Sequence, residues 1–312
     1  MNFLLYFGRK LGRALLTMFL VLLFVFAILR ITGDAAEIML PDDATEEEIA
    51  NLREIWGLDK PIHIQFSTYI SDVLKGNFGR SFRTREPVIR MVGRALPKTM
   101  LLMCVSLVFS FSISIPMGIY AAIKRGSLGD RIVMGAAIFG FSMPDFFFGI
   151  LLMFFFCMRL GMLPSAGSDT LAHLILPALT VGTNSMGSFA RFTRSSMLQT
   201  FGSHYVQAAV AKGVPWRRIL YRHALPNAAI PIVTILGTKI GGLIAGAVVA
   251  ETVFAWPGMG RLLVRSVSTR DLPLVQALII IMAASIIAAH LLVDLLYGLL
   301  DPRIRVSKTG KG

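Results

Sequence analysis

Charged residues are scarce in this sequence, and their scarcity excludes an ordinary water-soluble domain. Asp, Glu, Lys and Arg make up only 16% of the 312 residues, whereas hydrophobic residues make up 55% and the mean hydropathy is +0.68. A soluble domain carries about 25% charged residues. A lipid bilayer is therefore the natural solvent for most of this chain, and we expect one membrane domain.

Residues that build catalytic and metal sites are also few. The two cysteines, Cys104 and Cys157, lie inside apolar runs, where we expect buried small side chains rather than disulfide partners or metal ligands. The five histidines form no H-E-x-x-H spacing, and the sequence has neither a G-x-S-x-G elbow nor a G-x-x-x-x-G-K-[ST] phosphate loop. We therefore expect no catalytic residue, no metal site and no cofactor on this chain.

Six apolar runs are long enough to cross about 30 Å of hydrocarbon as helices. They are residues 11–31, 99–123, 132–158, 171–190, 228–250 and 274–300. The first run is too long for the apolar core of a signal peptide, and no small-x-small cleavage site follows it, so we interpret it as a retained span. The sequence thus predicts an all-α, polytopic membrane helix bundle with about six transmembrane helices.

Lys and Arg are distributed asymmetrically between the flanks of these runs. Sixteen of them, against two aspartates, fall in residues 9–13, 124–131, 191–222 and 301–311. Because cytoplasmic flanks are enriched in Lys and Arg, we expect these segments and both termini to be cytoplasmic. The net charge of +13 is then a signal of topology, and we expect no nucleic-acid partner.

The long segment 32–98 falls on the opposite side and has 9 Lys or Arg against 11 Asp or Glu. Its spacing predicts helices over Asp42–Arg53 and Ile62–Leu74, a turn at Trp56–Pro61, and a helix restart at Pro87-Val88. We expect a small helical extracytoplasmic segment, either a collar for a docking partner or a hairpin that covers the bundle. The predicted units are 1–31 (cytoplasmic end and first helix), 32–98 (outer helical loop), 99–300 (core) and 301–312 (cytoplasmic tail).

The loop 204–226 within the core is the most informative cytoplasmic segment. Lys212-Gly213 is typical of a helix C-terminus, and Pro215 suits the first turn of a second helix. The pattern predicts a compact helix–turn–helix that another protein can hold. An ordinary basic loop is the alternative.

This loop resembles the cytoplasmic loop of the permease subunits of ABC importers. The pattern of that loop begins with E-A-A, and a glycine follows after three further residues. Nine residues separate the glycine from a four-residue stretch that ends in Leu-Pro. The matching residues are Gln207, Ala208, Ala209, Gly213, His223, Leu225 and Pro226. Gln207 stands where the family has Glu. Nearly the whole chain is similar to the dipeptide, oligopeptide, nickel and glutathione permease group, and to the first permease of each pair. The supporting stretches are residues 57–61, 76–81, 142–144, 175–177, 190–197, 251–261, 270–273 and 301–305.

The resemblance implies a type I ABC importer transmembrane fold in a bacterial or archaeal inner membrane. It also implies a second homologous permease, two ATPase subunits that carry ATP and Mg, and an extracytoplasmic solute-binding protein, besides contact with membrane lipid. The function expected is import of di- or oligopeptides, with nickel chelates or glutathione as alternatives. The loop 204–226 would transmit force and perform no chemistry. A secondary transporter is the alternative of another class; it would need internal repeats, and none is evident.

Two further sets of residues are candidates for the transport path. Lys239 and Asp294 are ionisable residues inside apolar runs, where an uncompensated charge costs at least about 2.5 kcal/mol. We expect Lys239 to line the path and to pair with Asp294 or with a peptide carboxylate; a structural pair or a snorkelling Lys is the alternative. Trp256-Pro257-Gly258 is a candidate outer gate, with an interfacial Trp anchor as the alternative.

Overall fold

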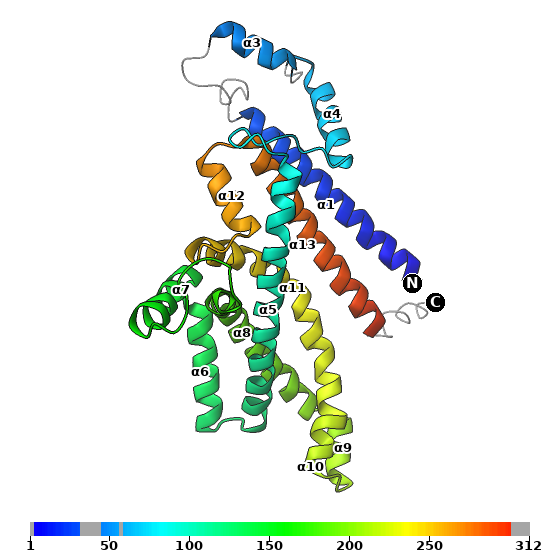
Figure 1. Cartoon of the computed structure of the whole chain (residues 1–312). Coiled ribbons are helices and arrows are strands. Elements are labelled where there is room, and N and C mark those ends of the chain that lie inside the picture. Colours follow the sequence, from blue (N-terminus) through cyan, green and yellow to red (C-terminus); the bar gives the residue numbers. More distant parts are fainter. Residues whose placement is uncertain (1–2, 32–44, 56–58, 301–312) are drawn as a thin grey trace, which may run out of the picture.

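The computed structural model describes residues 3–31, 45–55 and 59–300, and in this part of the chain the regular structure is helical apart from one bridge between Arg80 and Pro87. The helices form an elongated bundle (Figure 1). In chain order they are α1 (Phe3–Ile31), α3 (Glu46–Ile55), α4 (Ile62–Leu74), α5 (Val88–Ile123), α6 (Leu128–Ser142), α7 (Asp145–Leu152), the π-helix η1 (Met153–Arg159), α8 (Ala172–Phe201), α9 (His204–Ala211), α10 (Trp216–Arg218), the π-helix η2 (Ile219–Ala224), α11 (Leu225–Val253), α12 (Met259–Ser268) and α13 (Leu272–Leu300).

Helix α8 lies at the centre of the bundle and contacts α5, α6, α7 and α11. Glycines let the backbones approach closely, because a Cβ at Gly118 of α5 would lie 2.6 Å from the carbonyl oxygen of Ala190. The hydroxyl of Ser110 donates across the same interface to the carbonyl of Gly182 at 2.8 Å. Small residues and interhelical hydrogen bonds thus hold this core.

The predicted spans mostly coincide with helices. Three described helices are long and apolar enough to cross a membrane by length and composition, over 7–28, 88–123 and 272–295. Helices α8 and α11 also cover predicted spans, with 30 and 29 residues. Helix α8 is more polar than these three, and neighbouring helices surround it. The hydroxyl groups of Thr180 and Thr200 are buried and bond backbone carbonyls of α8 rather than face lipid.

The prediction of one continuous span over residues 132–158 is wrong. The chain bends by 104° between α6 and the segment formed by α7 and η1. Pro144 is the cause, because a proline disfavours helical geometry in the preceding residue, and Met143 is extended at φ −82° and ψ 126°. The apolar composition of this run concealed the break.

The short helices α3 and α4 lie beside one end of the bundle (Figure 1), as the predicted helical segment required. Helix α4 has the predicted bounds, and it packs Phe66 and Tyr69 against Phe26 of α1 with ring centroids 5.1 and 5.7 Å away. Burial raises the pKa of Tyr69 to about 12. Residues 42–44 and 56–58 of the predicted outer segment lie outside the described residues.

A buried ion pair joins α6 to α8 near the connection between α5 and α6. Arg194 donates two hydrogen bonds of 2.7 Å to the two carboxylate oxygens of Asp130. Asp130 is 4% exposed and also accepts from the backbone N–H of Gly126 at 2.9 Å. The pair fixes this connection against the central helix.

We expect Arg194→Met to lower the free energy of unfolding by about 3 kcal/mol, because it leaves the buried Asp130 carboxylate without its counter-charge. Arg194→Lys keeps the charge but loses the two-pronged geometry, so its effect should be intermediate. Melting temperatures of the purified chain in detergent measure both. Equal melting temperatures for Arg194→Met and the parent chain would contradict this account.

Candidate functional site

The predicted helix–turn–helix of residues 204–226 is present, and its turn has a defined hydrogen-bond pattern. Helix α9 ends at Ala211, and Gly213 adopts the left-handed conformation at φ +70°. The N–H of Val214 donates to the carbonyl of Ala209 at 3.1 Å, and the N–H of Gly213 donates to that of Val210 at 2.9 Å. These two bonds form a Schellman motif, which needs a residue such as glycine in the left-handed position.

A buried apolar cluster attaches this loop to the bundle. Ile219 and Leu220 of η2 are 1% and 8% exposed, and Val206 of α9 is 2% exposed. Leu220 packs in one cluster with Met197 of α8 and other residues of α5, η2 and α11. A force applied to α9 therefore reaches three long helices through close-packed side chains.

A groove of about 400 Å³ opens along α9. Its walls come from the end of α5, the end of α8, α9 itself and α10, and most of its lining side chains are apolar. The lining residues are Ala122, Ile123, Phe201, Val206, Gln207, Val210, Ala211 and Trp216. The Trp216 ring lies 5.3 Å from the Phe201 ring, centroid to centroid, and Trp216 remains 46% exposed. An accessible, largely apolar groove of this kind suits a protein partner.

Gln207, the first residue of the predicted motif, has a local role. Its side-chain amide donates to the carbonyl of Gly202 at 3.1 Å, at the C-terminal end of α8. A glutamate carboxylate could not donate this bond, and a negative charge is unfavourable at a helix C-terminus. Gln207 therefore ties α9 to the end of α8.

Some of the other residues of the predicted motif lie on the surface, and the rest lie where the loop joins α11. Ala208 and Gly213 are exposed, and Ala209 is half-buried. His223, Leu225 and Pro226 lie where η2 passes into α11, and the carbonyl of His223 accepts from the Asn227 side chain at 2.7 Å. The motif is thus spread from an accessible helix to the start of a long one.

At the other end of α11, a buried carboxylate organises the turn into α12. Glu251 is fully buried and accepts from the N–H groups of Gly260 and Arg261 at 2.7 and 3.1 Å. Thr99 of α5 donates its hydroxyl to Glu251 at 2.6 Å and accepts from the N–H of Met259 at 2.8 Å. Together the two side chains satisfy the first three N–H groups of α12. A Cβ at Gly258 would collide with the carboxylate, so glycine is required there.

Trp256 is buried within the protein, which argues against the alternative of an interfacial anchor. It is 2% exposed, packs with Leu102 and Leu174, and donates its indole N–H to the carbonyl of Lys98 at 3.0 Å. Pro257 and Gly258 follow it and line a pocket beside α12. The turn predicted as an outer gate is therefore firmly attached to α5.

The two ionisable residues predicted for the path have different outcomes. Asp294 forms an ion pair with Lys10 at 2.8 Å, which joins α13 to α1. The pairing of Asp294 with Lys239 and its place in the path stay predictions. The side chain of Lys239 lies outside the described residues, although its helix is described. The role of Lys239 in the path stays a prediction.

The sequence reasoning missed a third ionisable residue inside an apolar run. Asp145 follows the break at Pro144, and its carboxylate accepts from the side-chain amide of Asn184 on α8 at 3.1 Å. A carboxylate between two apolar stretches was the available signal. Over the described ranges, no three His, Cys, Asp or Glu side chains come together in a way that could hold a metal ion.

We expect Glu251→Ala to lower the free energy of unfolding by about 3 kcal/mol, because the buried N–H groups at the start of α12 lose their acceptor. Thr252→Ala is a matched control, because Thr252 is adjacent but exposed and bonds only within α11. Melting temperature and amide hydrogen exchange of α12 in detergent measure the two effects. If the amide protons of α12 exchange at the same rate in Glu251→Ala and Thr252→Ala, the capping role of Glu251 is wrong.

Comparisons with known proteins agree with this geometry. Residues 114–306 match the family of binding-protein-dependent transport system inner membrane components, and residues 1–103 match its N-terminal region. The di/tripeptide transport system permease protein of Pseudomonas aeruginosa is 37% identical, over 96% of this chain and 98% of that protein. The glutathione transport system permease protein of Salmonella choleraesuis is 41% identical, over 91% and 93%. The dipeptide transport system permease protein of Escherichia coli is 36% identical, over 96% and 98%.

Solved structures give the same fold. An inward-facing form of the MetNI methionine ABC transporter has a chain that superposes with a TM-score of 0.60 at 16% identity, over 69% of this chain and 99% of that chain. The all-helical ABC importer fold is therefore confirmed, and the family places ATP hydrolysis on other subunits. The chain belongs to the inner-membrane components of binding-protein-dependent transport systems, and it is a multi-pass permease subunit of an ATP-driven importer.

Proposed function

We propose that this permease pairs with a second, homologous permease and two ATPase subunits to import di- or oligopeptides that a solute-binding protein delivers. The observation that carries the proposal is the loop 204–226, an accessible helix with an apolar groove that is fixed to α5, α8 and α11 by buried side chains. An ATPase subunit held in this groove would move those helices when it closes on ATP. The bundle would then change between two packings.

The proposed orientation places α9, α10 and both termini in the cytoplasm. The distribution of Lys and Arg supports this orientation. The basic segments are the connection between α5 and α6, the end of α8 with the loop 204–226, and the two chain termini. Helices α3, α4 and α12 then face the extracytoplasmic side, where the solute-binding protein arrives. We further propose the boundaries 32–98 for the outer segment and 99–300 for the core.

Peptide is the proposed cargo because two of the relatives named above are a di/tripeptide and a dipeptide permease, and the similarity covers nearly their whole length. The glutathione permease relative supports the alternative of glutathione, itself a small peptide. Nickel chelates remain the third candidate. Lys239 is proposed to line the path, and Trp256-Pro257-Gly258 to act at its outer mouth as a rigid stop rather than a mobile flap.

We expect Gly213→Ala to reduce severalfold the amount of ATPase subunits that co-purifies with the tagged permease. The rate of ATP-driven peptide uptake should fall in parallel. An added Cβ meets no atom within 4 Å, so the effect comes from the left-handed backbone, where alanine costs about 1 kcal/mol and disturbs the angle between α9 and α10. The measurement is quantitative mass spectrometry of complexes in mild detergent, with uptake by proteoliposomes.

Gly161→Ala is the matched control, because Gly161 has φ +63° and open space around it but follows η1, outside the residues that line the groove. It carries the same backbone strain without the proposed docking role. Equal losses in the two variants would mean that strain alone, and not docking, explains the result. A permease that purifies without ATPase subunits and still transports peptide would contradict the proposed function.

A further inference from the structure

Four cationic side chains converge on one pocket between α5 and α12. Arg94 and Lys98 are one turn apart on α5, and Arg261 and Arg265 are one turn apart on α12. The pocket has a volume of about 400 Å³, and its remaining lining is apolar or glycine. Figure 1 places α12 beside the first turns of α5, away from the α9 end of the bundle.

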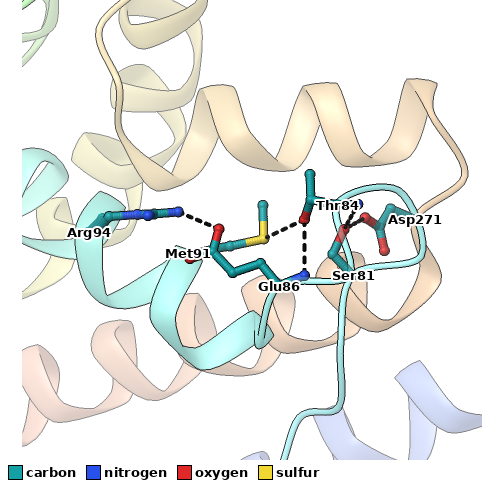
Figure 2. Close-up of polar contacts among 6 residues, drawn as sticks. All are labelled: Ser81, Thr84, Glu86, Met91, Arg94 and Asp271. Carbon is teal, nitrogen blue, oxygen red and sulfur yellow. Dashed lines mark hydrogen bonds and ion pairs between the residues drawn. The ribbon is translucent and has the colours of Figure 1, made fainter.

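The pocket has little negative charge of its own. Glu86 pairs with Arg94 at 2.7 Å at its edge, as Figure 2 shows, but the described lining includes no carboxylate. Lys98 contacts the Ser168 hydroxyl at 3.4 Å and lies over the Trp256 ring, and Arg261 donates to the carbonyl of Ala255. Arg265 is exposed and makes no side-chain hydrogen bond or ion pair in the part of the chain that is described.

Such a cluster is unfavourable unless an anion binds it. Like charges one turn apart destabilise a helix, and here two such pairs line the same pocket. The surrounding backbone is held firmly, because the Ser81 hydroxyl donates to the buried Asp271 where α12 meets α13 (Figure 2). The N–H of Phe82 donates to the same carboxylate. Arginine binds carboxylates well, because its planar guanidinium donates two parallel hydrogen bonds.

We propose that this pocket binds acidic side chains on the docking face of the solute-binding protein. The inference rests on the proposed function, in which α12 faces the extracytoplasmic side. Arg94 and Lys98 precede the apolar part of α5, and the side chain of Arg94 is 64% exposed, so the pocket is accessible from outside the chain. Four cationic side chains at the end of an apolar helix favour water over hydrocarbon. A soluble protein reaches such a surface, and complementary charge speeds its association.

The test measures how much solute-binding protein half-maximally stimulates the ATPase activity of the complete importer in nanodiscs of zwitterionic lipid. The probe is the binding protein that stimulates the wild-type complex. Arg265→Glu should raise the half-maximal concentration about tenfold at low salt and less at high salt, whereas Arg265→Lys should stay near wild type. Arg83→Glu, an exposed change of the same charge outside the pocket, is the matched control and should have little effect.

Glu86→Gln gives the opposite and more demanding result. It releases Arg94 from its ion pair, so the half-maximal concentration should fall about twofold, which a misfolded variant cannot imitate. A carbodiimide should also join the amine of Arg265→Lys to a carboxylate of the binding protein, identified by mass spectrometry.

Three outcomes separate the alternatives. Unchanged half-maximal concentrations in both Arg265→Glu and Glu86→Gln would overturn the pocket's role and leave the proposed function intact. If Arg265→Glu changes the half-maximal concentration only in nanodiscs that contain anionic lipid, and not in zwitterionic lipid, the pocket binds a lipid headgroup and the proposal is wrong. A complex that no binding protein stimulates would contradict the proposed function, and this inference with it.

Discussion

The bundle depends on one constraint: where the chain leaves a helix close to the bilayer, its backbone N–H groups need acceptors other than water. Three buried carboxylates supply them. Asp130 accepts from Gly126, Glu251 from Gly260 and Arg261, and Asp271 from Phe82, and these three acids are 4%, 0% and 2% exposed. Each carboxylate also binds a side chain from a distant helix or loop, so each junction is fixed to the bundle as well as satisfied.

Fixed junctions make α11 a mechanical link between the two ends of the molecule. It begins at Leu225, directly after η2, and ends at Val253, beside Glu251 and the turn into α12. The apolar cluster around Leu220 holds its first turns, and Thr99 and Trp256 hold its last turns against α5. A displacement of α9 therefore acts on a helix whose far end carries the α12 pocket. Packed side chains and hydrogen bonds therefore run without a gap from α9 to α12.

Local patterns in the sequence were sufficient for the loop 204–226 and for most spans. Gly213 and Pro215 determine the turn through backbone preferences of neighbouring residues, so the prediction needed no distant contact. The break at Pro144 is also a local signal, but it lies within a run whose apolar composition fits a continuous span. The contacts of Glu251 with Thr99 and of Asp130 with Arg194 join residues 152 and 64 positions apart, and no periodicity reveals such pairs. The same holds for the four cations of the α12 pocket, which come from two separate helices.

The different chemistry of the two exposed sites fits two different kinds of partner. An apolar groove such as that along α9 excludes water on contact and favours a long-lived complex, which suits the ATPase subunit proposed to dock there. A cationic pocket that opens to water accelerates encounter more than it strengthens the final complex, because exposed charges are screened and hydrated. The binding protein proposed to dock at the α12 end would have to arrive quickly and leave after each delivery. An electrostatic contact would meet that requirement better than an apolar one.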